Sequence, residues 1–242
     1  MDIIGVNVDP LNPAGAPDPA ALKAAGFNWV RLVSRPQPGV SAYVQQCQQA
    51  GIKVLAVVAG ESMQNGVPYK LDPPPDVYQL GNEPDGVGVS SWKMDQDAYA
   101  QLWNTNAAGL NAPAIAAGLC SDDPPGWIEN LLPSLQPQPR ALAVHPYGAT
   151  ADDAHDLFDS FAGLQFPLWL TEWNPLPRDW DELAVATNMA AVWAIFNSKA
   201  EAAFWFCWSD GMVPGLGLVD AQGEPKPAYA DLAQSMGSGA TA

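Results

Sequence analysis

The sequence contains few basic residues, few histidines and no long apolar run. Lys and Arg total 10 against 26 Asp and Glu, which gives a formal charge of -16, and 2 His occur in 242 residues. A surface of this charge repels phosphate backbones and anionic membranes, so neither nucleic acid nor a membrane is an expected partner. Because no apolar run reaches about 18 residues, no membrane-spanning helix is predicted. These features indicate a globular chain with ample length for a core.

Cysteine is also scarce, and its spacing predicts no metal site. Cys47, Cys120 and Cys207 cannot all pair within the chain, and none belongs to a C-x-x-C motif. They therefore indicate neither a disulfide framework nor a zinc site. No spaced cluster of His and acidic residues replaces them, so we expect no metal and no cofactor. A dinucleotide site is not indicated either, because no G-x-G-x-x-G motif follows the first apolar run.

Short, continuously apolar runs recur along the chain. Continuous apolar character is what the strands of a parallel sheet require when both faces are buried. Helix-like segments follow most of these runs, and eight such units fit a closed (β/α)8 barrel over residues 1–236, with a flexible tail over 237–242. A doubly wound open sheet is the rival fold. The predicted strands are Ile3–Val8, Trp29–Val33, Lys53–Val58, Val77–Leu80, Ala114–Ala117, Ala141–Val144, Leu168–Leu170 and Ala203–Trp208.

Capping residues indicate where the helices lie, and one helix is expected to be missing. Between the third and fourth strands, Gly60, Gly66 and Pro73-Pro74-Pro75 leave little room for a regular helix, so we expect the third helix to be reduced or absent. The other predicted helices are Ala20–Ala25 after Asp18, Tyr43–Ala50 after Ser41, Asp97–Ala108 after Asp95, Trp127–Leu135, Ala151–Phe161 and Glu182–Asn197 after Asp179.

Two glutamates stand at predicted strand ends, 89 residues apart. Glu83 follows the fourth strand in the motif Asn82-Glu83-Pro84, and Glu172 follows the seventh. The C-terminal strand ends of an α/β barrel carry its chemistry, and two carboxyl groups across one cleft can perform glycoside hydrolysis. We predict Glu172 as the nucleophile and Glu83 as the acid/base that protonates the leaving oxygen. The alternatives are a solvated loop residue for Glu83 and a structural ion pair with Arg31 for Glu172.

The ordered set of motifs resembles clan A of the retaining glycoside hydrolases, which are (β/α)8 barrels. Members carry an Asn-Glu pair after the fourth strand and a nucleophilic Glu after the seventh, as Asn82-Glu83 and Glu172 do here. The small barrels of family 128, which are endo-β-1,3-glucanases, are the most similar in appearance, and families 5 and 39 are rivals. Further matches are Arg31 in the second strand, His145-Pro146-Tyr147 after the sixth, and Trp205 to Asp210 in and after the eighth.

Four polar residues are predicted to support the two acids. Arg31 is a fixed cation whose fork can hold Glu172 ionised and oriented, although a purely structural ion pair is also compatible with it. Asn82 can form a hydrogen bond with a sugar hydroxyl. His145 and Tyr147 can bind the reacting sugar or the nucleophile, with a satisfied core histidine as the alternative for His145.

The chain holds ten Trp, and aromatic faces stack on the apolar faces of sugar rings. Most of these residues fall in strand or helix patterns and are expected in the core. We predict Trp208 as the platform under the reacting sugar and Trp173 in a neighbouring subsite. If the eighth strand ends earlier than predicted, Trp205 replaces Trp208.

Together these observations predict a retaining, endo-acting hydrolase of a neutral β-linked glycan that works as a monomer. The alternatives are a catalytically silent barrel that binds glycan and the same chemistry on a bacterial cell-wall glycan. No basic n-region or apolar h-region follows Met1. A protein that stays inside the cell and a secreted protein with a trimmed signal both fit this start.

Overall fold

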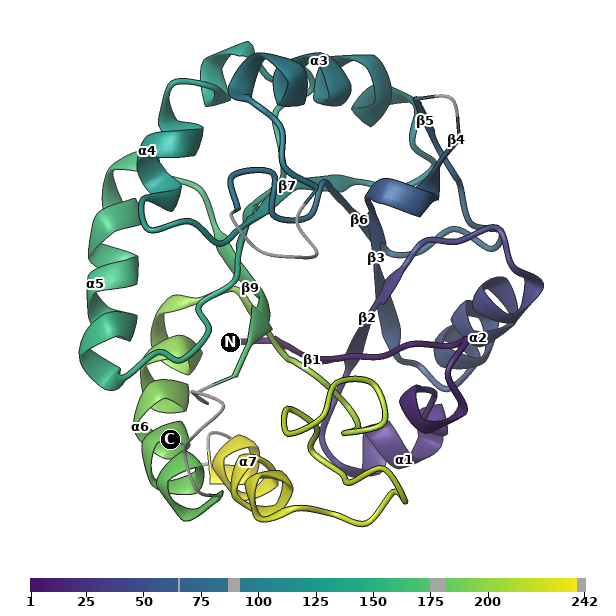
Figure 1. Cartoon of the computed structure of the whole chain (residues 1–242), viewed down its shortest axis with the longest axis vertical. Helices are drawn as coiled ribbons and strands as arrows, with labels where there is room; N and C mark the ends of the chain where they lie inside the picture. Colours follow the sequence, from purple (N-terminus) through teal and green to yellow (C-terminus); the bar gives the residue numbers. More distant parts are fainter. Residues whose placement is uncertain (65, 87–91, 175–181, 239–242) are drawn as a thin grey trace.

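Eight parallel strands close into a barrel in the computed structural model, which describes residues 1–64, 66–86, 92–174 and 182–238 (Figure 1). The predicted (β/α)8 fold is therefore confirmed. Three predicted strands have the observed bounds, whereas the eighth ends at Trp205, three residues early. In barrel order the strands are β1 (Ile3–Asn7), β2 (Trp29–Val33), β3 (Lys53–Val58), β6 (Val77–Leu80), β7 (Ala114–Leu119), β8 (Leu142–Val144), β9 (Leu168–Trp173) and β10 (Ala202–Trp205).

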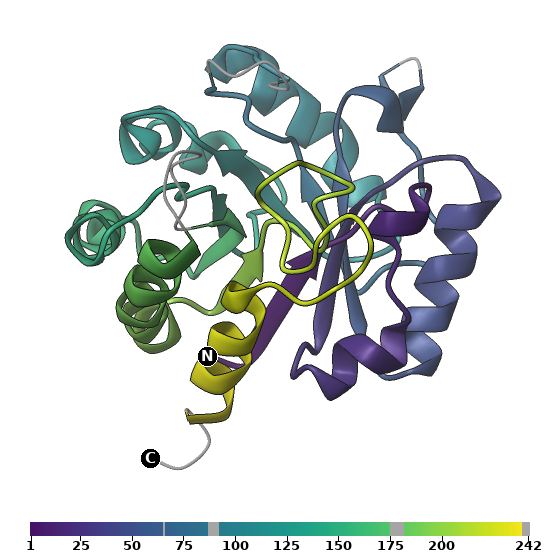
Figure 2. The ribbon, with the colours of Figure 1, turned by 60° about the horizontal axis from the view of Figure 1, so that its bottom comes forward.

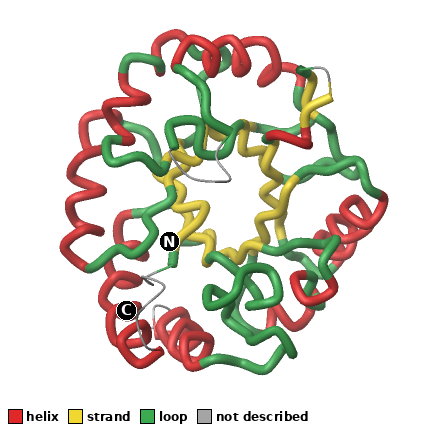
Figure 3. The backbone as a smooth tube through the Cα atoms, in the orientation of Figure 1, coloured by secondary structure: helices red, strands yellow, loops and turns green. Residues whose placement is uncertain are grey.

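Helices form an outer ring around this barrel (Figure 3). Two predicted caps are confirmed: the Asp18 carboxylate accepts from the Ala20 N–H at 2.9 Å, and the Asp95 carboxylate accepts from the Ala98 N–H at 2.7 Å. The predicted start at Ser41 is wrong, because the second helix begins at Pro38 and Ser41 lies inside it. Asp179, the predicted cap of α6, lies outside the described residues. The described helices are α1 (Pro19–Ala24), α2 (Pro38–Gln49), α3 (Gln96–Asn106), α4 (Pro124–Glu129), α5 (Ala151–Phe161), α6 (Glu182–Lys199) and α7 (Pro227–Ser238).

The segment between β3 and β6 lacks a regular helix in its described residues. A single 3₁₀ turn, η2 (Gly60–Ser62), leads into a two-stranded antiparallel hairpin of β4 (Met63–Gln64) and β5 (Val67–Pro68). Gly60 has a φ of 49°, a conformation that glycine adopts without strain. The predicted reduction of the third helix is therefore confirmed.

An apolar cluster fills the N-terminal half of the barrel interior. Trp29, Trp169 and Phe204 form its centre, with the rings of Trp29 and Trp169 edge to face at 5.6 Å between centroids. Gly5 leaves room for this packing, because a Cβ there would lie 2.2 Å from Cδ1 of Phe204. With this half closed by apolar side chains, polar residues that point inward are found toward the C-terminal strand ends.

Two strands carry one residue more than regular pairing needs. Leu170 and Trp173 in β9 pair with Ala203 and Trp205 in β10, so three steps in β9 oppose two in β10. A similar shift in β7 separates Ala116 from Leu119, opposite β8. An extra residue of this kind changes which face of the sheet the following side chains occupy.

The long segment between β10 and α7 folds against the barrel beside β1 (Figure 2). The Trp208 N–H donates to the Asn7 carbonyl at 3.0 Å and ties the two together. Helix α7 continues to Ser238, two residues into the predicted tail, and 239–242 lie outside the described residues. None of the described helices is both long and apolar enough to cross a membrane.

Candidate active site

The structure brings the two predicted acids together at the C-terminal end of the barrel. Glu83 follows β6, Glu172 lies in β9, and they are 8% and 7% exposed. Three atoms lie within 4.8 Å of one another: one carboxylate oxygen of Glu83, one carboxylate oxygen of Glu172 and a ring nitrogen of His145. Glu83 has a φ of 52°, and its N–H donates to the Gly118 carbonyl at 2.8 Å. Strained backbone of this kind is concentrated at functional sites.

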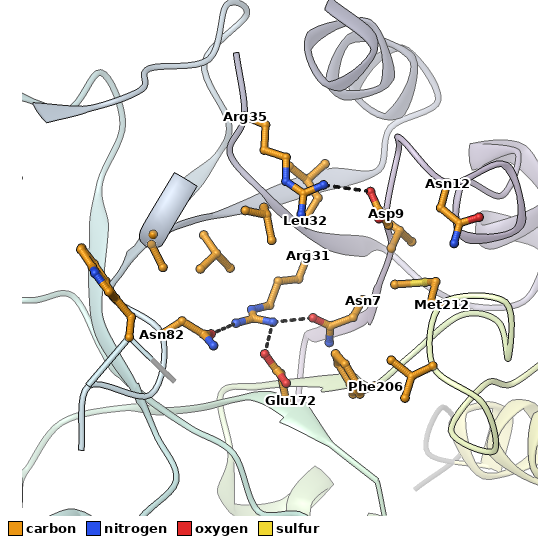
Figure 4. A pocket seen from close by; sticks show the side chains of 17 residues that line it. Asn7, Asp9, Asn12, Arg31, Leu32, Arg35, Asn82, Glu172, Phe206 and Met212 are labelled. Carbon is orange, nitrogen blue, oxygen red and sulfur yellow. Dashed lines mark hydrogen bonds and ion pairs between the residues drawn. The ribbon is translucent and has the colours of Figure 1, made fainter. Parts of the chain in front are cut away.

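Arg31 organises one side of the site (Figure 4). Its Nη1 donates to Oε1 of Glu172 at 2.6 Å and to Oδ1 of Asn7 at 2.6 Å, and its Nε donates to Oε1 of Gln79 at 3.0 Å. Its Nη2 donates to Oδ1 of Asn82 at 2.6 Å. Arg31 is itself buried, so these bonds hold the guanidinium in one orientation.

The amide of Asn82 is oriented by two donors. Its Oδ1 accepts from Arg31 and also from Nε2 of Gln79 at 3.3 Å. Gln79 is fixed in turn, because its Nε2 also donates to the Gly81 carbonyl at 2.9 Å. With Oδ1 occupied by these donors, the Nδ2 group of Asn82 remains as the donor that a ligand in the cavity can use.

His145 and Tyr147, which follow β8, contact the two acids. Nδ1 of His145 lies 3.0 Å from Oε1 of Glu83, and its Nε2 lies 3.1 Å from Oγ1 of Thr171 and 3.7 Å from Oε1 of Glu172. The Tyr147 hydroxyl donates to Oε2 of Glu172. Both carboxylate oxygens of Glu172 therefore accept a hydrogen bond, one from Arg31 and one from Tyr147.

These contacts decide the charge of Glu172. Burial alone would raise the pKa of its carboxyl group. The charges of His145 and Arg31 and the hydrogen bonds from Tyr147 and Arg31 outweigh burial, so the pKa of Glu172 lies below its usual range. Burial and the Glu172 carboxylate raise the pKa of Tyr147, so the phenol keeps the proton it donates. Glu172 is therefore an oriented carboxylate at neutral pH.

Glu83, His145 and Glu172 are also close enough together to share a metal ion, by distance alone. However, the Arg31 guanidinium lies 2.6 Å from Oε1 of Glu172 and repels a cation at that position. Tyr147 occupies the other oxygen. The arrangement suits two carboxyl groups in acid–base and nucleophilic roles better than it suits metal binding.

A thiol beside Glu83 is not a nucleophile. Burial raises the pKa of Cys120 to about 12, with further contributions from Glu83, Asp85 and Glu172, so the sulfur stays protonated at neutral pH. Asp85 fastens this region, because its carboxylate accepts from the Cys120 N–H at 3.1 Å and from the Ser121 hydroxyl at 2.6 Å. These bonds hold the loop after β6 against the loop after β7.

A cavity of about 610 Å³ opens beside Glu172, a size typical of small-molecule sites (Figure 4). Arg31, Asn82 and Asn7 line it near the acid, and Phe206 and Trp92 are its aromatic side chains. The walls combine apolar surface with polar and charged side chains, as ligand sites commonly do.

The predicted tryptophan positions need correction. Trp173 is 1% exposed and stacks on Trp193 at 5.9 Å, because the extra residue in β9 turns Glu172 inward and Trp173 outward toward α6. Trp205 is buried against Trp173, and Trp208 packs edge to face on Tyr229. None of the three predicted tryptophans lines the cavity. The prediction of a subsite at Trp173 is therefore wrong.

Three polar residues of the site were not predicted: Asn7, Gln79 and Thr171. Asn7 donates to the carbonyls of Thr171 and Trp205 at 3.0 and 3.1 Å while it accepts from Arg31. Each of the three is a polar residue inside or at the end of an otherwise apolar run. A buried polar side chain needs partners, so this interruption of the run was the signal available in the sequence.

Comparison with known proteins agrees with this geometry. Residues 71–230 match the protein family described as glycosyl hydrolase catalytic core. The GH5_18 protein from Streptomyces cattleya, solved in complex with GlcNAc, is 13% identical, with a TM-score of 0.72 over 99% of this chain and 80% of that chain. The GH128 (subgroup II) endo-β-1,3-glucanase from Sorangium cellulosum is 15% identical, with a TM-score of 0.70 over 96% of this chain and 98% of that chain.

A third similar structure, the endo-β-1,4-glucanase from Xanthomonas axonopodis pv. citri, is 15% identical, with a TM-score of 0.65 over 98% of each chain. A search of curated protein sequences found no match. At these identities the structures establish a common fold. The predicted resemblance to the clan A barrels is confirmed by the family match and these structures together.

Proposed function

Because the chain belongs to the glycosyl hydrolase catalytic core family, we propose that it is a retaining β-glycosidase that cleaves a neutral glycan by double displacement. The observation that carries this proposal is the distance between the acids: oxygens of Glu83 and Glu172 lie within 4.8 Å. Retaining enzymes hold their carboxyl groups about 5–5.5 Å apart, whereas inverting enzymes need about 6.5–9.5 Å to admit a water.

The two acids have different surroundings, which supports different roles. Glu172 is held ionised by Arg31 and Tyr147, as a nucleophile must be. It attacks the anomeric carbon while Glu83 protonates the leaving oxygen. A water activated by Glu83 then hydrolyses the glycosyl–Glu172 ester with a second inversion. His145 contacts both acids and helps to hold their carboxyl groups in position during these proton transfers.

The substrate we propose is a neutral β-glucan cut internally. The formal charge of -16 disfavours anionic polymers. Two of the similar barrels are endo-glucanases, and each is covered over 98% of its length. Tyr147, beside the acids, is 39% exposed, so the reacting position is reached directly from solvent.

Labelling tests the nucleophile and the sugar in one experiment. The protein is incubated with a panel of 2-deoxy-2-fluoro glycosides, and its mass and labelled peptide are measured. One sugar should trap the protein covalently on Glu172. Label on another residue would overturn the assigned role.

Variants test the pair of acids. Glu172→Gln and Glu83→Gln are assayed on glucans, mannans and peptidoglycan, with Glu201→Gln, at the opposite end of the barrel, as the control. The first two should lose turnover and the control should keep it. Undiminished turnover in either site variant contradicts the mechanism, and turnover of peptidoglycan alone would replace the glucan assignment by a cell-wall glycan.

A further inference from the structure

The cavity extends to one side of the catalytic pair. It is lined by residues on or after β1, β2, β3, β6 and β10 and by Glu172 of β9, whereas Glu83, His145 and Tyr147 are not among its lining residues. In the proposed double displacement, the nucleophile forms a covalent bond with the sugar on the glycone side, and the acid/base protonates the oxygen of the leaving group. A cavity that reaches Glu172 but not Glu83 therefore lies on the side of the sugar that becomes bound to the protein.

A pair of opposite charges stands in the wall of this cavity. Arg35 follows β2 and Asp9 follows β1, and in Figure 4 they lie across Arg31 from Glu172. Nη1 of Arg35 is 3.6 Å from Oδ1 of Asp9, and the side chains are 24% and 34% exposed. This separation is longer than the roughly 2.7–2.9 Å of a charge-assisted hydrogen bond, and partly exposed pairs of this kind add little stability. Both charged side chains line the cavity.

Asp9 is held in place by the backbone rather than by Arg35. Its Oδ1 accepts from the Leu11 N–H at 3.0 Å, and its own N–H donates to the Gly15 carbonyl at 2.9 Å. A Cβ on Gly15 would lie 2.7 Å from Cγ of Met212 and 3.2 Å from Cβ of Asp9, so Met212 lies beside this acid. An anchored carboxylate, a guanidinium and an apolar side chain thus meet at one wall.

We propose that Arg35 and Asp9 form a second sugar subsite, for the unit that precedes the reacting sugar on the side of the nucleophile. This proposal rests on the proposed function. Neighbouring hydroxyls of a neutral sugar can each donate and accept, so one accepts from Arg35 while another donates to Asp9. The sugar's apolar face lies against Met212.

Binding energy gained at this subsite can lower the barrier of the reaction at the neighbouring sugar. Contacts with a sugar unit that does not react can be used to orient the unit that does, so they raise kcat/KM for longer substrates. The subsite therefore predicts that a disaccharide attached to a leaving group reacts faster than the corresponding monosaccharide.

Dinitrophenyl β-glycosides of glucose, cellobiose and laminaribiose test this prediction, because their leaving group needs little help from Glu83. In the wild type, one of the disaccharides should exceed glucose in kcat/KM at least about tenfold. Arg35→Met and Asp9→Asn should each lower kcat/KM for that disaccharide by roughly 10- to 100-fold, as expected for one hydrogen bond to a charged group. The value for the glucoside should change less than about twofold.

Arg140→Met is the matched control. Arg140 forms an ion pair of the same kind with Glu201 at 3.5 Å, before β8 and far from the cavity. It should leave the ratio between disaccharide and monosaccharide unchanged. Equal wild-type values for both glycone lengths, or equal losses on both in the Arg35 and Asp9 variants, overturn the subsite and leave the proposed function standing. If no glycoside reacts and no fluoro sugar labels Glu172, the proposed function itself fails.

Discussion

Replacing Tyr147 with phenylalanine removes one hydrogen bond to Glu172 and little else. The phenol donates to Oε2 of Glu172, and its ring packs edge to face on Phe206 at 5.7 Å, a contact that phenylalanine retains. Because this hydrogen bond helps to lower the pKa of Glu172, its loss moves that pKa upward. A larger fraction of the nucleophile is then protonated in mildly acidic solution, so the acidic limb of the kcat/KM–pH profile shifts to higher pH.

The size of the loss at neutral pH follows from the same bond. A hydrogen bond to a charged group contributes about 1.5–3 kcal/mol, and each 1.4 kcal/mol corresponds to about tenfold in rate. The bond also fixes the orientation from which the Glu172 carboxylate attacks, and Arg31 retains part of that orientation when the phenol is removed. We therefore expect kcat/KM to fall by about tenfold, with roughly 100-fold as the upper limit.

The assay is the pH dependence of kcat/KM with a dinitrophenyl glycoside, and Tyr43→Phe is the matched control. Tyr43 is buried in α2 and its hydroxyl donates to the Pro17 carbonyl at 2.8 Å, away from the site. Its loss should lower the free energy of unfolding by about 1 kcal/mol without moving the pH profile. If the acidic limb of Tyr147→Phe stays where it is in the wild type, Tyr147 does not help to keep Glu172 ionised and the reasoning fails.

Three further predictions follow from the site. Glu83→Gln should slow glycosides with poor leaving groups by about 10²–10⁴-fold but affect a dinitrophenyl glycoside less in the glycosylation step; equal losses would argue against proton donation by Glu83. Because the pKa of Glu172 is lowered in the folded protein, its contribution to stability is complete above about pH 4.3 and is lost as the pH falls toward the native pKa. Thermal melts should therefore show a weaker acid destabilisation in Glu172→Gln than in the wild type. Trp173→Ala should cost about 3–5 kcal/mol of unfolding free energy through the cavity it leaves, with no selective loss on longer substrates; a loss that grew with glycan length would restore Trp173 to a subsite.

The sequence was sufficient to predict where the acids lie, but not which tryptophans reach the sugar. Continuous apolar runs marked the strand ends, and β2, β3 and β6 have the predicted bounds. Those runs cannot reveal an extra residue inside a strand, because leucine, threonine and tryptophan are compatible with either face. Trp173 was predicted to face the sugar, but the extra residue in β9 turns its side chain away from the barrel interior.

The network around Arg31 was predictable in part. Arg31 and Glu172 were paired as one alternative, and the structure contains that pair together with the acid pair. Gln79 and Asn7 each interrupt an apolar run, but one polar residue hardly changes the periodicity of a run and does not show which residue it contacts. Their importance comes from burial: Arg31 has several donors to satisfy, and only side chains brought in by neighbouring strands can accept from them.

The irregularities of β7 and β9 explain why both acids can meet. In a strand of strict alternation, Thr171 and Glu172 would face opposite sides, yet Thr171 contacts His145 while Glu172 contacts Arg31. The extra residue of β9 allows both side chains to point into the barrel. In β7 the extra residue presents Gly118, where a Cβ would lie 2.8 Å from Nε2 of His145. The missing Cβ lets His145 reach Glu83 and Thr171 at once, so the catalytic geometry depends on two departures from regular β-structure, one in the strand that carries Glu172 and one in the strand that meets Glu83.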